Sequence, residues 1–217
     1  MSERIALVTG ASRGFGAAVA EALSKNGYHV IALARTVGGL EDLDDRIQAA
    51  GGSTTLVPLD ITDEDGLQRL CLSIFERWGR IDLLVHSAIF AGPLSPAAHV
   101  PLSDWDKTLA VNIRATQRLV AMTESLLKAA GNGVAVLPID NKAGDKFFAS
   151  YGASKAAQQA IWDSWAQESA ATGPEILRFA PNPMPTALRA RFFPGEDRDA
   201  LVHPSIEAAR LVDFLTS

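Results

Sequence analysis

Short apolar runs alternate along the chain with longer segments in which apolar residues recur at helical spacing. Ile5–Thr9 is almost continuously apolar, which is typical of a parallel strand covered on both faces. Five further runs are also short enough to be strands: 29–34, 54–59, 81–85, 134–137 and 175–179. The pattern therefore predicts six strands.

Helical segments are expected between these strands. Gly27 ends a small-residue helix that reaches about Asn26, and Ser103 begins a long helix. The other helices are expected at 40–50, from 62, at 103–130, at 150–171 and, after a proline-rich loop, from 205. Because strands and helices alternate without a linker or a repeat, we expect one domain over residues 1–217. Its fold class is α/β, with a Rossmann-type doubly wound parallel sheet of about six strands and helices on both faces.

The composition of the chain excludes several classes of function. The chain has 217 residues, a net charge of −5 and a pI near 5.4, so it carries no electrostatic footprint for nucleic acid or an anionic membrane. No apolar run approaches a membrane span, and the first expected strand begins too early to leave room for a leader. The single cysteine, Cys71, can form no internal disulfide. We therefore expect a cytoplasmic protein, and we assign no metal site.

The first expected strand runs into a glycine-rich turn, TGASRGFG at 9–16. Glycines permit a tight turn and let the backbone approach a pyrophosphate, while the N-terminus of the following helix offers free N–H groups to the phosphates. Three glycines at this junction predict a dinucleotide site. Its expected contacts are Gly10, Ser12, Arg13, Gly14, Phe15 and Gly16.

The end of the second strand indicates which dinucleotide is bound. An acid about 20 residues beyond the glycines favours NAD, whereas an arginine there accommodates the 2′-phosphate of NADP. The sequence has Arg35 at this point and no acid before Glu41. Arg35, with Arg13 and Ser12, can hold a phosphate through charge-assisted hydrogen bonds. We therefore expect NADP, with NAD as the alternative.

Tyr151 and Lys155 lie four positions apart in a segment with a helical pattern. On a helix, positions i and i+4 share a face, so the ammonium is expected beside the phenol. A free tyrosine titrates near pH ~10, and an adjacent positive charge lowers its pKa toward the working pH. The pair is typical of acid–base chemistry on an alcohol or a carbonyl.

In their order and spacing, these motifs resemble the classical branch of the short-chain dehydrogenase/reductase family. The likeness covers nearly the whole chain, through TGASRGFG, LDIT at 59–62, VNIRAT at 111–116, YGASK at 151–155 and an altered PNPMPT at 181–186. The resemblance implies that Tyr151 is the general acid/base, that Lys155 assists it and holds the nicotinamide ribose, and that Asn112 holds a proton-relay water. The further cofactor contacts expected are Asp60, Ile61, Ser87, Ala88 and Thr186. Asp60 is alternatively a helix cap.

The family's usual serine, a hydroxyl on the strand before Tyr151, has no counterpart here. Counting back from Tyr151 leads to Pro138, following the strand forward leads to Asp140, and aligning on the Ala-Gly pair that follows leads to Asn141. A neutral amide N–H stabilises a developing oxyanion, whereas an ionised carboxylate repels it. We therefore prefer Asn141 as the catalytic replacement, with Asp140 effective only when protonated.

Two more regions depart from the family pattern. The fourth strand ends in His86-Ser87-Ala88, where a pair of asparagines is usual; Ser87 is read as a polar replacement and His86 as a structural residue. The chain ends in a helix similar to the penultimate one of the family, without the seventh strand. We expect a homodimer formed by the helices at 103–130 and 150–171, in which Trp162 and Trp165 belong to the core or to the interface.

The sequence thus predicts an NAD(P)-dependent oxidoreductase that transfers a hydride between nicotinamide and a small carbonyl or alcohol substrate. Four phenylalanines are expected to wall the substrate site: Phe147, Phe148, Phe192 and Phe193. The alternative is a catalytically weak NADP-binding sensor or interaction protein on the same fold. The missing serine, the altered asparagines and the missing strand favour that alternative.

Overall fold

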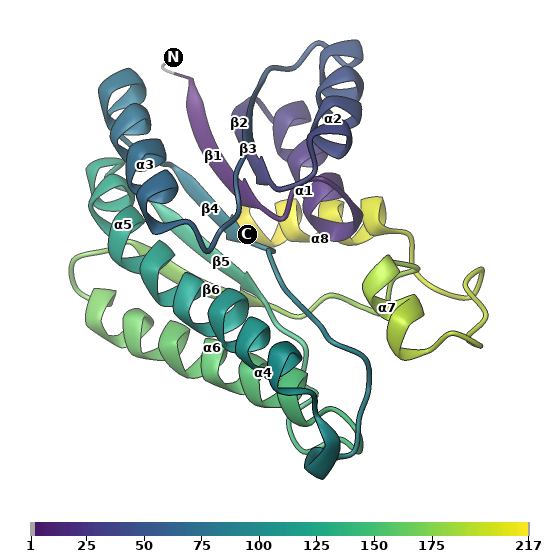
Figure 1. Ribbon diagram of the computed structural model, residues 1–217. Helices are drawn as coiled ribbons and strands as arrows, with labels where there is room; N and C mark the ends of the chain where they lie inside the picture. The colour runs from purple at the N-terminus through teal and green to yellow at the C-terminus, as the bar shows by residue number, and fades with distance from the viewer. Residues whose placement is uncertain (1–2, 217) are drawn as a thin grey trace.

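The computed structural model describes residues 3–216, and its centre is a parallel sheet of six strands (Figure 1). The strands lie in the order β3-β2-β1-β4-β5-β6, as in a doubly wound sheet. Their bounds are β1 Arg4–Thr9, β2 Tyr28–Ala34, β3 Thr54–Pro58, β4 Leu83–His86, β5 Val134–Pro138 and β6 Glu175–Phe179. The predicted fold class is therefore confirmed, with strand ends that differ by at most two residues from those expected.

Helices cover both faces of the sheet (Figure 1). One face carries α1 (Gly14–Lys25), α2 (Val37–Ala49) and α8 (Pro204–Thr216). The other face carries α3 (Glu64–Trp78), α5 (Ala115–Ala129) and α6 (Ala149–Ser169). The long helix expected at 103–130 consists of α4 (Leu102–Thr108), a π-helical segment (Leu109–Arg114) and α5 in unbroken succession.

The segment before α8 differs from the sequence prediction. It was expected to be a proline-rich loop, but it contains the short helix α7, Ala187–Phe192. The prolines lie outside this helix, and the Thr186 hydroxyl caps it by accepting a hydrogen bond from the Arg189 backbone N–H. A helix of six residues is too short to give a clear periodic pattern.

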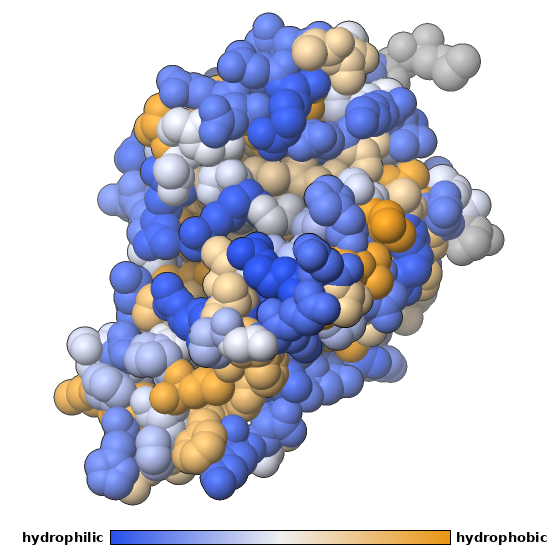
Figure 2. All heavy atoms as spheres, turned by 90° about the vertical axis from the view of Figure 1, so that its right-hand side faces the viewer, coloured by the Kyte–Doolittle hydropathy of each residue, from blue (hydrophilic) through white to orange (hydrophobic). Residues whose placement is uncertain are grey.

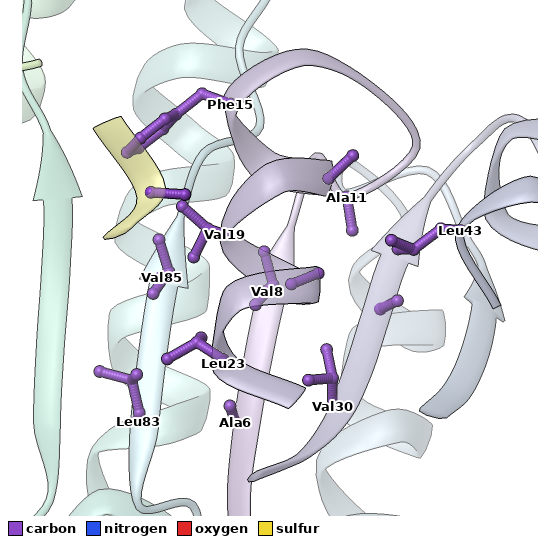
Figure 3. Packing of buried hydrophobic residues seen from close by; sticks show 14 of the residues in the cluster. Ala6, Val8, Ala11, Phe15, Val19, Leu23, Val30, Leu43, Leu83 and Val85 are labelled. Atoms are coloured by element: carbon purple, nitrogen blue, oxygen red, sulfur yellow. The ribbon is translucent and has the colours of Figure 1, made fainter. Parts of the chain in front are cut away.

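The core is divided by the sheet into two layers. Along β1, Ala6 and Val8 face one layer and Ile5 and Leu7 face the other, as the two-residue period of a strand requires. Figure 3 shows the first layer, in which α1 packs on β1 and its neighbours. In the second layer Trp162 and Trp165 are both buried, with ring centroids 5.3 Å apart. These tryptophans therefore belong to the core of the chain.

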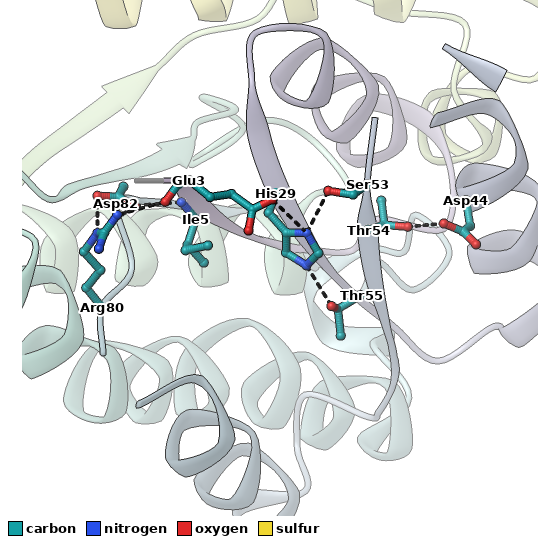
Figure 4. A network of polar contacts seen from close by, with 9 residues as sticks. All are labelled: Glu3, Ile5, His29, Asp44, Ser53, Thr54, Thr55, Arg80 and Asp82. Atoms are coloured by element: carbon teal, nitrogen blue, oxygen red, sulfur yellow. Dashed lines mark hydrogen bonds and ion pairs between the residues drawn. The ribbon is translucent and has the colours of Figure 1, made fainter. Parts of the chain in front are cut away.

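A polar network ties together the amino ends of the central strands (Figure 4). His29 in β2 bonds through its two ring nitrogens to Ser53 Oγ and Thr55 Oγ1, at 2.9 and 2.8 Å. The Asp82 carboxylate accepts the Ile5 backbone N–H at 2.7 Å. The network lies at the edge of the sheet opposite to the glycine-rich turn. Among the described helices, none combines the length and the apolarity needed to cross a bilayer.

Candidate active site

A cleft of about 610 Å³ opens at the carboxyl ends of the strands, where ligands bind in open α/β sheets. It contains every residue expected to bind the cofactor, together with Tyr151. Asn112 and Asn141 are not among the residues that line it. Figure 2 views the molecule from the side of α7, where hydrophilic residues cover most of the surface and apolar residues form smaller patches.

Glycine is sterically required at two positions of the turn after β1. Gly10 has a φ of +71°, and a Cβ there would lie 2.8 Å from the Ala88 backbone nitrogen. At Gly16, a Cβ would lie 2.3 Å from the Gly10 carbonyl oxygen. No side chain caps the N-terminus of α1. The turn therefore brings bare backbone and the positive end of a helix to the cleft, and this arrangement fits a pyrophosphate.

Arg35 and Asp60 lie side by side at the outer end of the cleft. Arg35 Nη1 is 3.7 Å from Asp60 Oδ2, and the Arg35 side chain is 58% exposed. Asp60 Oδ1 also accepts hydrogen bonds from the backbone N–H and the hydroxyl of Thr62. Partial burial acts to raise the pKa of Asp60, but these hydrogen bonds and the Arg35 charge outweigh it and hold the pKa below its usual value. The helix cap of α3 is Asp63, not Asp60.

Tyr151 donates a hydrogen bond to Asp140, with 3.0 Å between Tyr151 Oη and Asp140 Oδ2. Its side chain is buried, and the Phe192 ring packs edge-on against it at 4.9 Å. Burial raises the pKa of the phenol, and the Asp140 charge and hydrogen bond raise it further. The sequence predicted the opposite direction, because it placed only the Lys155 ammonium beside the phenol.

Lys155 lies on the same wall of the cleft, but its hydrogen bonds go elsewhere. Its Nζ donates to the Pro138 carbonyl oxygen at 2.9 Å and to Gln158 Oε1 at 3.0 Å. Burial lowers the pKa of Lys155 to about 8, and Asp140 partly opposes this shift. Near neutral pH the amine is therefore largely charged and close to the point at which it loses its proton.

A buried polar chain connects Lys155 to the end of β4. Gln158 Nε2 donates to Thr116 Oγ1, and the Thr116 hydroxyl donates its only proton to the Asn112 carbonyl. Thr116 Oγ1 must therefore accept from His86 Nε2, which fixes the proton of the neutral imidazole on that nitrogen. His86 Nδ1 then accepts from Thr9 Oγ1. Burial, reinforced by the Lys155 charge, lowers the pKa of His86 to about 3, as suits a structural residue.

Asn112 lies in the π-helical segment and is fully buried. Its side-chain NH₂ donates to the Phe90 carbonyl at 2.8 Å and to Ser154 Oγ at 2.9 Å, and its Oδ1 accepts the Phe90 backbone N–H at 2.8 Å. Both amide protons are thus in use. The side chain anchors the loop after β4 to α6, and the relay water that the resemblance implies stays a prediction.

Asn141, the preferred serine replacement, is not brought to the site. It is exposed, and its Oδ1 accepts a long hydrogen bond of 3.4 Å from Gln159 Nε2. The preceding residue, Asp140, takes the position beside Tyr151 instead. The chain turns at Asn141, where the Lys142 backbone N–H donates to the Asp140 carbonyl at 3.0 Å, so the two neighbouring side chains take different positions.

Several contributing residues were not identified from the sequence. The Glu207 side chain in α8 is nearly fully buried and accepts the backbone N–H and the side-chain NH₂ of Asn182, at 2.9 and 2.8 Å. It thereby holds the loop after β6, which lines the cleft. Gln158 and Thr116 complete the buried chain. Their only signal was spacing, because Gln158 follows Lys155 by three positions and Thr116 follows Asn112 by four.

The expected aromatic wall forms in part. Phe148 and Phe192 are buried against Tyr151, and Phe192 and Phe193 line the cleft. Phe147 is 44% exposed and lies outside it. Ser87, Ala88 and Thr186 all reach the cleft.

Comparison with known proteins assigns the family. Residues 4–197 match the family model of the short chain dehydrogenases. The chain belongs to the short-chain dehydrogenase/reductase family. The D-threitol dehydrogenase of Mycolicibacterium smegmatis is 31% identical over 91% of this chain and 76% of its own.

Two further proteins show how far the likeness extends. The glycine betaine reductase ATRR of Emericella nidulans is 33% identical over 87% of this chain, which spans only 15% of that protein. A metagenomic short-chain oxidoreductase solved in complex with NADP has a TM-score of 0.84, with 27% identity over 100% of this chain and 91% of its own.

Proposed function

We propose that this protein is an NADP(H)-dependent oxidoreductase in which Tyr151 exchanges the proton that accompanies hydride transfer to or from a small substrate. The observation that carries the proposal is the single cleft that runs from the glycine turn past Arg35 to Tyr151 and Lys155. The carbonyls and alcohols of the family are the substrate class from which the proposal starts.

The residues of the cleft fit the dinucleotide from end to end. The turn at Gly10 and Gly16 receives the pyrophosphate, and Lys155 and Thr186 hold the nicotinamide end. Arg13 and Arg35 meet the 2′-phosphate, which supports NADP over NAD. When bound, the nicotinamide supplies or accepts the hydride, while Tyr151 holds the proton at its phenol oxygen.

The experiment follows NADPH oxidation with a panel of small carbonyls, comparing wild type with Tyr151→Phe. The phenylalanine keeps the ring and removes the proton, so we expect turnover to fall by about 100-fold or more, as for loss of a general acid. NADPH binding should change little. Tyr28→Phe, which removes the other tyrosine of the chain, is the matched control and should retain activity.

A second candidate is a cofactor-binding protein with little turnover. The observation that favours it is the hydrogen bond from Tyr151 to Asp140, which occupies the phenol proton. Equal, near-background NADPH oxidation by wild type and Tyr151→Phe, with normal NADPH binding, would favour this second candidate over the enzyme.

We also propose a homodimer formed through α5 and α6. The exposed side of α6 carries small residues at helical spacing, Ala153, Ala156, Ala160 and Ser164, which allow another helix to approach closely. Sedimentation should give twice the mass of the chain, and Ala156→Arg should shift it to a single copy. A monomeric wild type at micromolar concentration would contradict the dimer.

A further inference from the structure

A carboxylate lies at the reacting end of the cleft. Asp140 Oδ2 is 3.0 Å from the Tyr151 phenol oxygen, and both side chains line the cleft. Among the described residues, no cation forms an ion pair with Asp140. The nearest candidate on this wall, Lys155, donates instead to Pro138 and Gln158. The Lys155 charge is near enough to interact with Asp140, but it forms no ion pair with that carboxylate.

This charge opposes carbonyl chemistry. Hydride transfer to a ketone builds negative charge on oxygen, and enzymes stabilise it with donors or cations aimed at that oxygen. A carboxylate beside the proton donor does the reverse, because like charges repel, and it also holds the donor's proton in a hydrogen bond. An ionised Asp140 is therefore unfavourable in a site that reduces ketones.

The opposite holds for a carbon–nitrogen double bond. An iminium is cationic before it accepts a hydride, and the reverse reaction, oxidation of an amine, builds positive charge on nitrogen. A neighbouring carboxylate favours the iminium over the neutral imine, which is a weaker hydride acceptor. Resting on the function proposed above, we propose that the substrate carries nitrogen at the reacting carbon, so that the reaction interconverts an iminium and an amine.

The surroundings of Tyr151 suit an organic cation. The faces of aromatic rings attract cations, and Phe148 and Phe193 already receive the Lys142 ammonium, at 5.4 and 5.9 Å from their ring centroids. The Lys142 charge is itself paired with Asp145 at 3.1 Å. Phe192, which lines the cleft, packs against Tyr151 at 4.9 Å, so a substrate cation at Tyr151 would lie near an aromatic ring as well as the Asp140 carboxylate.

The step balances without a further reactant. The iminium carbon accepts the hydride from NADPH, the π pair of the C=N bond becomes the lone pair of the amine nitrogen, and NADP⁺ is released. The iminium is reduced and NADPH is oxidised. When a neutral imine enters, Tyr151 gives its proton to the nitrogen and regains one from water.

The test compares matched substrates with NADPH: the cyclic imines pyrroline and dihydroisoquinoline, each beside its ketone, cyclopentanone or tetralone. Wild type is expected to reduce each imine at least about tenfold faster than its ketone, relative to the uncatalysed rates. Asp140→Ser, which restores the hydroxyl, should reverse the preference. Asp163→Ser is the matched control, because it removes a half-exposed carboxylate of α6, paired with Arg178, that lies outside the cleft, and it should leave the preference unchanged.

A binding measurement supplies a readout independent of turnover. Calorimetry on protein saturated with NADP⁺ compares pyrrolidine, which is cationic at neutral pH, with cyclopentanol. Wild type should bind the amine about tenfold more tightly than the alcohol, and Asp140→Ser should lose this difference.

The outcomes separate the two proposals. Preferential ketone reduction by wild type, or an imine preference that survives Asp140→Ser, overturns the nitrogen substrate and leaves the oxidoreductase standing. Absence of turnover on both classes combined with no preference for the amine in binding also overturns it. Failure to bind NADPH at all removes the oxidoreductase and the nitrogen substrate together.

Discussion

At the scale of the residue, Tyr151 is held neutral by its surroundings. Burial and the Asp140 carboxylate both disfavour the phenolate, and the Lys155 ammonium is directed to Pro138 and Gln158. In the free protein the Tyr151 phenol therefore keeps its proton and donates it in a hydrogen bond to Asp140. A substrate can take this proton only if its own acceptor atom competes with the Asp140 carboxylate for the hydrogen bond.

The chain has two tyrosines, so the Tyr28→Phe variant reports on Tyr151 alone. In that variant the phenol should ionise above the ordinary value of about pH 10, followed by phenolate absorbance. Adding Asp140→Asn should lower the pKa, because it removes the repelling charge. Circular dichroism at each pH is the control for unfolding. A Tyr151 pKa near the ordinary value of about 10 that does not change on Asp140→Asn would contradict the hydrogen bond between the two side chains.

The buried, neutral His86 should lower the free energy of unfolding as the pH falls. Burial lowers its folded pKa to about 3, below the unfolded value of about 6.5, so the unfolded chain binds more protons between these values. Stability should then fall as pH drops below about 6.5. At about pH 5 this linkage amounts to about 2 kcal/mol.

The measurement is urea unfolding at neutral pH and at about pH 5 for wild type and His86→Asn. Wild type should lose about 2 kcal/mol more than the variant over this interval, whatever the variant's stability at neutral pH. Parallel losses in the two proteins would show that His86 is not neutral and buried.

At the scale of the element, the loop after β6 is held from a distance by α8. Glu207 accepts two hydrogen bonds from Asn182 and pairs with Arg210. Burial acts to raise the pKa of Glu207, but the hydrogen bonds from Arg210 and Asn182 outweigh it, so the carboxylate stays charged. This contribution to stability is present above the ordinary pKa of about 4.3 and is lost as pH falls below it.

Glu207→Ala leaves the Asn182 N–H without its acceptor and should lower the free energy of unfolding by about 1–3 kcal/mol. It should also weaken NADPH binding, because the loop lines the cleft. Chemical unfolding and a cofactor titration measure the two effects. Asp213→Ala, an exposed carboxylate on the same helix, is the control. Equal effects from both variants would remove the special role of Glu207.

Sequence pattern was sufficient for the six strands, the longer helices and the glycine turn, because these depend on local periodicity and spacing. It was insufficient for the loop between β5 and α6. A Cβ on Gly152 would lie 2.3 Å from the Lys142 carbonyl oxygen, so this loop packs directly on α6. That packing selects Asp140 rather than Asn141 and places a carboxylate at Tyr151, eleven residues away along the chain. The i, i+4 spacing of a helix predicted that Lys155 lies near Tyr151, but it carries no information about Asp140, which lies in a loop.

At the scale of the whole molecule, the right-handed crossovers of the parallel sheet bring the carboxyl ends of all six strands to one edge. Residues far apart in the sequence, such as Gly10 and Thr186, line a single cleft at this edge. The chain is acidic overall, with a net charge of −5, yet Arg13 and Arg35 lie at the end of the cleft assigned to the ribose phosphate. We therefore expect cofactor selectivity to depend on local charge.

The most direct test of the account is the affinity of the purified protein for NADPH and NADH, followed by nicotinamide fluorescence. Wild type should prefer NADPH. Arg35→Ser should weaken NADPH binding by about 10-fold to 100-fold, the range for a lost charge-assisted hydrogen bond, and leave NADH binding unchanged. Arg46→Ser, on α2 outside the cleft, should change neither. A wild type that binds neither nucleotide, or an Arg35→Ser variant with undiminished NADPH affinity, would contradict the account.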